Sequence, residues 1–351
     1  MSRYQFRLDP QTGTLSEDDS KKYFSTVGIA IFLFMFASHF TSFAASRLLE
    51  RFAPTLLEMA AVTNGLSLLI QYGIALPLAL VALKKLPKDT NPSEQLGAKS
   101  FLGVICVAFT FMSVGGTVAN IMTGTIELLS GKSLTNPVES TTYGESFLVN
   151  FIFLALLAPV IEELVFRKLI CDRLLPLGEG YAVVLSAAIF GLVHGNLFQF
   201  FYAFLTGMLF SYVYIKTGRL RYTISIHMVI NFLGGVLLPW AIEKLTPVLT
   251  EETYERLNEA LTIGDPATME ALAEELSPYM LPVLLYSGYE LLFTVLSIAG
   301  VFIFFNNVKK LKLRGGLLPP AKEGRIANIF CNGGVALAIA AFAVIFVVSL
   351  V

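Results

Sequence analysis

Long apolar segments separated by short polar ones recur along the whole chain. A helix that spans a bilayer needs about 20 mainly apolar residues. Charge-poor windows of roughly this length occur at about 23–46, 64–83, 101–125, 147–170, 181–194, 197–215, 222–242, 280–305 and 328–350. Only His194-Gly195-Asn196 interrupts the uncharged stretch from 181 to 215, which is long for one span, so we predict a turn there.

The basic residues indicate how these segments are oriented. With nine spans and a cytoplasmic N-terminus, 20 of the 25 Lys and Arg residues fall on the cytoplasmic side. This bias follows the positive-inside rule. One helix more or fewer in the middle of the chain would move all later loops to the other side of the membrane and remove the bias. The pattern predicts an all-α, polytopic membrane helix bundle of about nine transmembrane helices. The five basic residues predicted outside are Arg47, Arg51, Lys132, Lys244 and Arg256.

Composition supports a membrane protein and disfavours two other classes. Hydrophobic residues make up 55% of the 351 residues and charged residues 15%, and the mean hydropathy is +0.69. Soluble domains carry about 25% charged residues. The formal net charge of −1 gives no basic field for nucleic acid. Cys106, Cys171 and Cys331 are too scattered for a disulfide framework or a thiolate zinc site.

The same pattern divides the chain into five parts. We predict two short surface helices in the acidic loop, one of them capped by Asp265 and begun by Pro266. The predicted parts are a cytoplasmic tail (1–22), accessory helices 1–3 (23–146), a core of helices 4–7 (147–242), an acidic extracytoplasmic loop (243–278) and helices 8–9 (279–351).

Ionisable residues inside apolar helices are costly and mark candidate functional sites. In the fourth helix, Glu163 and Arg167 stand at i, i+4 and can pair. Glu162 lies about 100° around the helix from Glu163 and lacks that partner. A carboxylate without a cation is the better proton acceptor, so we predict that Glu162 transfers protons. The alternative is a charge network at the helix end.

Two further polar groups occur in later helices. His194 follows Phe190-Gly191-Leu192-Val193, and His227 and Asn231 share one helix face at i, i+4. Two hydrogen-bonding groups on one face can stabilise a developing negative charge or hold two helices together. We leave His39 out as an interhelical donor. Glu290 faces either a water-filled cavity or a basic partner, and it stays a functional candidate.

Taken together, Glu162-Glu163-x-x-x-Arg167, Phe190-x-x-x-His194 and His227-x-x-x-Asn231 resemble the CPBP family of intramembrane proteases, also called Abi. This family includes type II CAAX prenyl endopeptidases and bacteriocin-processing and self-immunity proteins. Gly195-Asn196, Gln199, Gly207 and Thr217-Gly218 look like the bacterial branch. The resemblance covers about 147–235 and leaves out the first three helices, the acidic loop and the last two helices.

The resemblance implies roles for these residues. Glu162 and His194 would activate water, His227 and Asn231 would form the oxyanion hole, and Glu163 and Arg167 would support the site. Glu162, His194 and His227 also form a His₂Glu inventory of zinc ligands. Because no HExxH motif occurs, we expect catalysis without a cofactor and keep zinc as the alternative.

The leading hypothesis is therefore a hydrolase of the bacterial cell membrane, an endopeptidase that cleaves a membrane-associated protein or peptide. Its expected partners are that substrate and the lipid bilayer, not nucleic acid. On the predicted topology Glu162 and His227 lie in the cytoplasmic half and His194 deeper, so access is expected from the cytoplasm. The alternatives are a non-catalytic membrane partner or immunity protein of the same family and a transporter or proton relay that uses Glu290. The sequence does not name the substrate.

Overall fold

The computed structural model describes residues 4–90, 93–137, 142, 146–248, 250–263 and 266–348, and it is built from helices with no named strand in these parts. Helical segments that follow one another without a break form the longer spans. The α-helices are α1 Glu17–Phe52, α2 Ala60–Leu68, α3 Leu76–Leu83, α4 Ala98–Ser130, α6 Phe147–Asn150, α7 Ala158–Glu163, α8 Asp172–Leu174, α9 Glu179–Leu192, α10 Leu197–Thr217, α11 Leu220–Phe232, α12 Leu238–Leu245, α13 Glu251–Ile263, α14 Pro266–Leu276, α15 Met280–Val308, α16 Arg325–Phe330 and α17 Gly333–Val348. The π-helices are η2 Leu69–Ala75, η3 Phe151–Leu157, η4 Leu164–Cys171 and η6 Leu233–Leu237, and the 3₁₀ turns are η1 Pro54–Leu56, η5 Leu175–Leu177 and η7 Ser277–Tyr279.

The prediction of a polytopic helical membrane protein is confirmed. In the described part of the chain, seven helical segments are long and apolar enough to cross a membrane. They coincide with seven of the nine predicted windows. The other two windows, at 181–194 and 328–350, contain the shorter apolar helices α9 and α17. The predicted turn at His194-Gly195-Asn196 is also confirmed, since α9 ends at Leu192 and α10 begins at Leu197.

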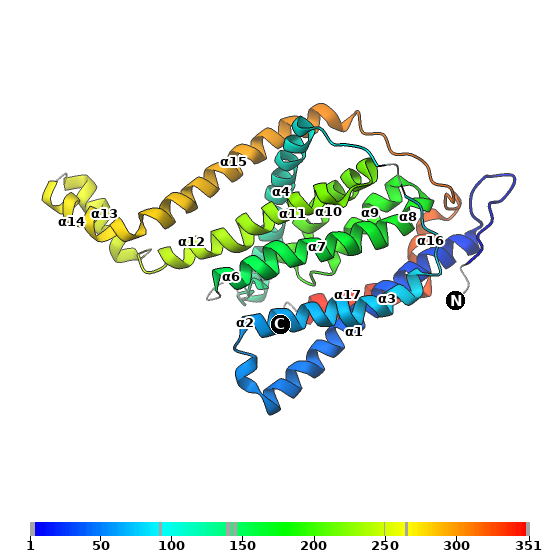
Figure 1. Ribbon diagram of the computed structural model, residues 1–351, viewed down its shortest axis with the longest axis horizontal. Coiled ribbons are helices and arrows are strands. Elements are labelled where there is room, and N and C mark those ends of the chain that lie inside the picture. Colours follow the sequence, from blue (N-terminus) through cyan, green and yellow to red (C-terminus); the bar gives the residue numbers. More distant parts are fainter. Residues whose placement is uncertain are drawn as a thin grey trace.

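The helices pack in a continuous series (Figure 1). α15 packs on α4, α4 on α10 and α10 on α9, while α1 packs on α3 and α17. The largest buried cluster joins α1 and α3 to η4, α9 and α10. Where α15 meets α4, Thr110 Oγ1 donates to the carbonyl of Ser297 at 2.7 Å, and Gly300 has no room for a Cβ against the Cys106 carbonyl. Small and hydroxyl side chains therefore hold these apolar helices together, as is usual in membranes.

The segments predicted on the cytoplasmic side meet at one end of the bundle, toward the right of Figure 1. The backbone N–H of Asp89 donates to the Asp172 carbonyl at 2.8 Å, and that of Glu94 to the Thr217 carbonyl at 2.7 Å. The segment between α15 and α16 crosses the same end, where Glu179 N–H donates to the Arg314 carbonyl at 3.0 Å. This grouping is the one that the charge-derived topology requires; Arg3, one of the counted residues, lies outside the described residues.

The acidic segment 243–278 lies at the opposite end, toward the left of Figure 1. It contains α13 and α14, so the two predicted surface helices are present, and an exposed ion pair between Arg256 and Glu275 joins them at 2.7 Å. α14 begins at Pro266 as predicted, whereas Asp265 lies outside the described residues. The division of the chain into five parts stays a prediction.

Three π-helices directly precede a proline at the second position of the next helix. η2 is followed by Leu76-Pro77, η3 by Ala158-Pro159 and η6 by Leu238-Pro239. Proline has no N–H to continue the hydrogen-bond ladder. A π-turn next to it leaves a backbone carbonyl free inside a membrane helix, where another donor must satisfy it.

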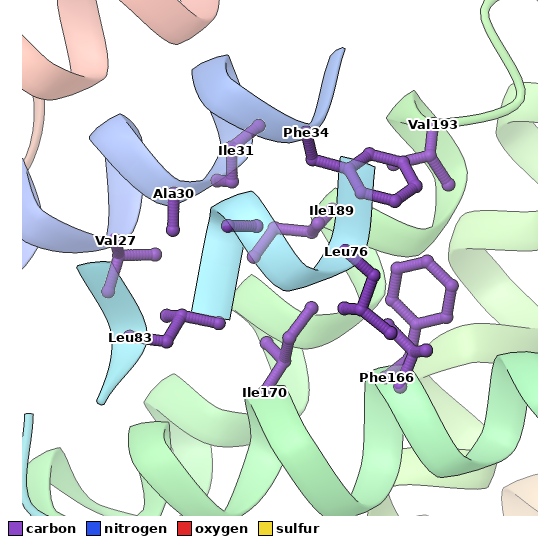
Figure 2. Close-up of a pocket in the computed structure, with 12 residues that line it drawn as sticks. Val27, Ala30, Ile31, Phe34, Leu76, Leu83, Phe166, Ile170, Ile189 and Val193 are labelled. Carbon is purple, nitrogen blue, oxygen red and sulfur yellow. The ribbon is translucent and has the colours of Figure 1, made fainter. Parts of the chain in front are cut away.

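A small apolar cavity lies between α1, α3, η4 and α9 (Figure 2). It has a volume of about 30 Å³, and its lining includes Ile31, Leu76, Phe166 and Ile189. An apolar void of this size gives a water molecule no hydrogen-bond partner. It is a packing defect of the core and is too small for a ligand.

Candidate active site

The pairing predicted in the fourth helix is present. Arg167 Nε donates to Glu163 Oε2 at 3.0 Å and Nη2 donates to Oε1 at 3.2 Å, so the contact is bidentate. Both side chains are fully buried. A buried carboxylate is tolerated in a membrane only when a cation and hydrogen bonds compensate it. This arrangement ties Glu163 to a structural role and leaves Glu162 as the separate carboxylate.

Neighbouring helices surround the Arg167 guanidinium. The rings of Phe190 on α9 and Phe210 on α10 lie 4.9 and 5.7 Å from the guanidinium carbon. Nη1 donates to Ser186 Oγ at 3.4 Å, and this hydroxyl donates to the Phe166 carbonyl at 2.9 Å. Aromatic faces attract a cation, and Ser186 accepts one of its remaining hydrogens. Arg167 is therefore held from three sides.

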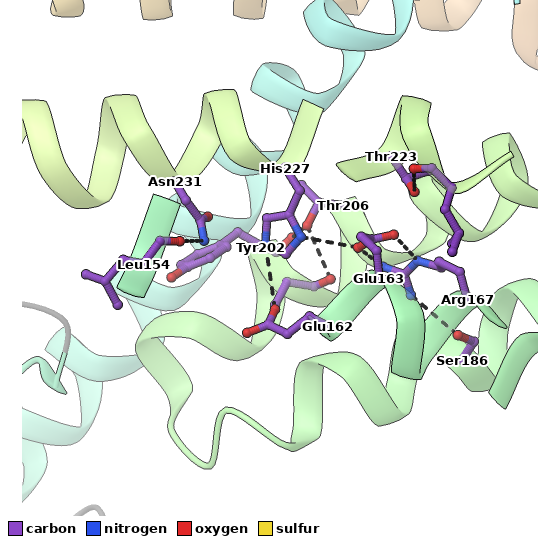
Figure 3. Close-up of polar contacts among 12 residues, drawn as sticks. Leu154, Glu162, Glu163, Arg167, Ser186, Tyr202, Thr206, Thr223, His227 and Asn231 are labelled. Carbon is purple, nitrogen blue, oxygen red and sulfur yellow. Dashed lines mark hydrogen bonds and ion pairs between the residues drawn. The ribbon is translucent and has the colours of Figure 1, made fainter. Parts of the chain in front are cut away.

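His227 on α11 lies between the two adjacent glutamates (Figure 3). Its Nδ1 is 3.2 Å from Glu163 Oε1, and its Nε2 is 3.7 Å from Glu162 Oε2. Its ring also contacts Phe210, with the two centroids 5.5 Å apart. Because a carboxylate oxygen only accepts, Nδ1 carries a hydrogen toward Glu163. Nε2 faces Glu162, whose side chain is 19% exposed against 0% for Glu163.

His194 lies in the turn after α9. Its Nδ1 is 2.8 Å from the carbonyl of Phe190, and its ring packs edge-on against the Phe190 ring at 5.1 Å. A carbonyl only accepts, so Nδ1 carries the hydrogen and Nε2 keeps a lone pair that can take a proton. His194 interacts electrostatically with Glu162 and His227. The structure thus brings three predicted residues into one region, Glu162 from α7, His227 from α11 and His194 from the turn after α9.

Asn231 connects α11 to the helix that carries the glutamates. Its Nδ2 donates to the carbonyl of Leu154 at 2.9 Å (Figure 3). This carbonyl is free because of the local sequence: Ala158 N–H reaches back five residues to Phe153, and the next donor in that register would be Pro159, which has none. Asn231 therefore holds two helices together and keeps a second N–H for another acceptor.

Two polar residues outside this cluster behave differently. His39 is exposed on α1 and contacts the carbonyl of Met35 in its own helix at 2.9 Å, so the structure shows an intrahelical contact for it. Glu290 is exposed on α15, and Tyr289 interacts with it electrostatically. The predicted basic partner of Glu290 is not among the ion pairs of the described residues.

The sequence pattern did not reveal four residues that complete the cluster. Ser186 and Phe210 contact Arg167, and Tyr72 and Tyr202 each interact electrostatically with Glu162. Tyr72 comes from η2, far outside the three motifs. A search for charged residues in apolar helices does not find uncharged ones. Only the position of Ser186, four residues before Phe190, could have indicated that it belongs to the cluster.

The alternative zinc ligands were Glu162, His194 and His227. In the described part of the chain, no group of three or more His, Cys, Asp and Glu residues is arranged to hold a metal ion. His227 presents its Nδ1 to Glu163, and His194 presents its Nδ1 to a carbonyl. The expectation of a cofactor-free site stays a prediction, to be tested by metal analysis of purified protein.

Comparison with known proteins shows what the segment that carries this cluster is similar to. Residues 144–233 match the family model described as type II CAAX prenyl endopeptidase Rce1-like. The resemblance drawn from the three motifs is confirmed. All three motifs lie inside the matched segment, which covers about a quarter of the chain. No solved structure gives a significant match.

Two curated bacterial proteins are similar to the chain. One is the putative membrane peptidase YdiL of Bacillus subtilis, 25% identical over 174 residues that cover 48% of this chain and 69% of that protein. The other is the membrane-embedded CAAX protease MroQ of Staphylococcus aureus, 35% identical over 105 residues that cover 27% of this chain and 42% of that protein. With its apolar helices, the chain is a multi-pass bacterial membrane protein, and its residues 144–233 are similar to a family of membrane proteases.

Proposed function

We propose that the protein is an intramembrane endopeptidase that hydrolyses a peptide bond of a membrane-associated protein or peptide. The observation that carries this proposal is the unequal surroundings of the two adjacent glutamates. Glu163 is fully buried and bound by Arg167, whereas Glu162 is partly exposed and faces His227. A base must reach both water and substrate, so Glu162 is the carboxylate suited to proton transfer.

In the proposed reaction, water lies between Glu162 and Nε2 of His194. As the water oxygen bonds to the carbonyl carbon, its proton passes to this pair, and the π electrons of the carbonyl move to its oxygen. The N–H groups of His227 and Asn231 stabilise that oxygen. When its electrons re-form the carbonyl, the C–N bond breaks, and the proton held by Glu162 and His194 passes to the leaving amine nitrogen. His227 can donate from Nε2 only when its ring carries both hydrogens, because Nδ1 already donates to Glu163.

An apolar groove on α11 and η3, the elements that carry His227 and the acceptor of Asn231, suits a membrane-associated substrate. It has a volume of about 270 Å³ and lies between η3 and the α11–η6 segment, with Phe151, Met228 and Phe232 in its lining. Met228 directly follows His227 in the sequence. Apolar walls next to a few polar groups are typical of ligand sites. The groove would receive an apolar part of the substrate close to the reacting bond.

The test compares wild-type protein with Glu162→Gln, which keeps the shape of the side chain and removes the base. Purified full-length protein in liposomes is incubated with a detergent-solubilised extract of bacterial membrane proteins, and mass spectrometry identifies new N-termini. We expect the wild-type cleavage products to disappear with Glu162→Gln and to persist with Glu290→Gln, the control on α15.

Unchanged products with Glu162→Gln would refute the proposal. If Glu162→Gln and His194→Ala both preserve the cellular phenotype while cleavage stops, the protein acts as a non-catalytic partner. Flux of ions or protons across the liposomes that requires Glu290 would instead support a transporter.

A further inference from the structure

A chain of side-chain hydrogen bonds starts at the turn that carries His194, and the mechanism above does not use it. Asn196 Nδ2 donates to the carbonyl of His194 and to Gln199 Oε1, both at 2.8 Å. Asn196 Oδ1 accepts the backbone N–H of Gln199 at 2.9 Å and so caps α10. Asn196 is buried. Asn196 therefore fixes the orientation of the Gln199 amide, and Asn196 is itself fixed by burial and by its hydrogen bonds to the backbone.

The Gln199 side chain continues the chain to Tyr202, because its amide is a hydrogen-bond partner of the Tyr202 phenol. Its oxygen already receives a hydrogen from Asn196, whereas its NH₂ takes part in none of the other hydrogen bonds of the described residues, so we assign the NH₂ end to the phenol. An amide NH₂ can only donate. The phenol oxygen therefore accepts from Gln199, and its own O–H is left to donate to a different group.

The position of Tyr202 brings this donor to the active site. Its ring packs against the main buried cluster, and it interacts electrostatically with Glu162. In Figure 3 the ring lies among the site residues, between Glu162 and Asn231 in this view. The backbone is held in place because Gly115 of α4 packs directly against it, with no space for a Cβ. A rigid helix position thus places the phenol among the residues of the candidate site.

We propose that Tyr202 is a further catalytic residue of the endopeptidase, whose phenol donates a hydrogen bond to the carbonyl oxygen of the scissile bond. Asn196 and Gln199 are positioning residues that direct this donor. The inference rests on the proposed function. The phenol keeps its proton throughout, since the proton of the attacking water passes to Glu162 and His194.

The hydrogen bond from Tyr202 would increase the rate because the charge on the substrate oxygen changes during the reaction. A fixed donor binds the negative oxygen of the tetrahedral intermediate more strongly than the neutral carbonyl, so it lowers the barrier. Removal of one such donor from an oxyanion hole costs about 10²–10³ in kcat. Because Asn196 and Gln199 already hold the Tyr202 hydroxyl in position, no energy is spent on turning this donor during the reaction.

The experiment uses the cleavage site that the membrane extract shows to be cut fastest, made as an internally quenched synthetic peptide. We expect kcat of Tyr202→Phe to fall about 10²–10³-fold with little change in KM, because only a transition-state contact is lost. Gln199→Leu should lower kcat about 10- to 100-fold, again with KM preserved. Tyr212→Phe, on the same helix, is the control and should match wild type.

Equal kcat values for wild type and Tyr202→Phe would overturn the inference. A rise in KM with unchanged kcat would also overturn it, because that result means ground-state binding. Thermal unfolding of each variant identifies those that fail to fold, and if Tyr202→Phe fails, the result with Gln199→Leu decides. Glu162→Gln in the same assay separates the two proposals: full activity of this variant would refute the proposed reaction at Glu162, whereas its inactivity beside a fully active Tyr202→Phe refutes only the role of Tyr202.

Discussion

Replacement of Arg167 by Met should strongly destabilise the protein. The change removes two hydrogen bonds to Glu163, at 3.0 and 3.2 Å, and leaves that carboxylate fully buried without its cation. Removal of one partner from a buried ion pair costs about 3–5 kcal/mol of unfolding free energy. Met keeps much of the apolar volume beside Phe190 and Phe210. The loss of unfolding free energy therefore measures the missing charge and its hydrogen bonds rather than the creation of a cavity.

The assay is reversible unfolding of the purified protein in mixed detergent micelles, followed by circular dichroism. Arg47→Met is the matched control, because Arg47 forms an exposed pair with Glu50 at 3.0 Å. Exposed pairs contribute at most about 1 kcal/mol. A double variant, Glu163→Gln with Arg167→Met, should lose less than the sum of the single variants by about 1–3 kcal/mol. Equal losses for Arg167→Met and Arg47→Met, or additive single variants, would show that the buried pair does not act as a unit.

Two glycine positions give further predictions with internal controls. Gly300→Ala places a Cβ against the backbone of α4, so it should lower the unfolding temperature in detergent, whereas Gly288→Ala on the same helix meets open space and should not. Gly316→Ala pushes into the backbone just before α9 and should expose the segment between α15 and α16 to added protease, whereas Gly315→Ala should leave the digestion pattern unchanged. An intact digestion pattern for Gly316→Ala would mean that this segment tolerates displacement.

Much of the architecture could be predicted because it depends on local properties. Segment length and hydropathy determine where membrane helices occur, and the i, i+4 spacing places Glu163 and Arg167 on one helix face. Both predictions use the geometry of a single helix. The turn at His194-Gly195-Asn196 was predicted for the same reason, since a charge-free stretch from 181 to 215 exceeds one span.

The contacts between helices could not be predicted in this way. His227 meets both glutamates because α11 packs against α7, and Asn231 finds its acceptor because Pro159 has no N–H to donate to the Leu154 carbonyl. Tyr202 is uncharged and lies in an apolar helix, so neither charge nor periodicity distinguishes it from a core residue. Such contacts depend on the rotation and separation of helices that are distant in the sequence.

The short length of α9 has a consequence for any substrate. A helix of 14 residues rises about 21 Å, whereas the hydrocarbon layer is about 30 Å thick. α9 starts at the end of the bundle where Glu179 pairs with Lys216, so if this end lies at the membrane surface, the turn with His194 is expected inside the hydrocarbon layer. Peptide bonds at that depth are normally shielded inside a helix. A substrate of the proposed endopeptidase would therefore have to unwind locally, or enter as an extended chain end, before a peptide bond could reach His194.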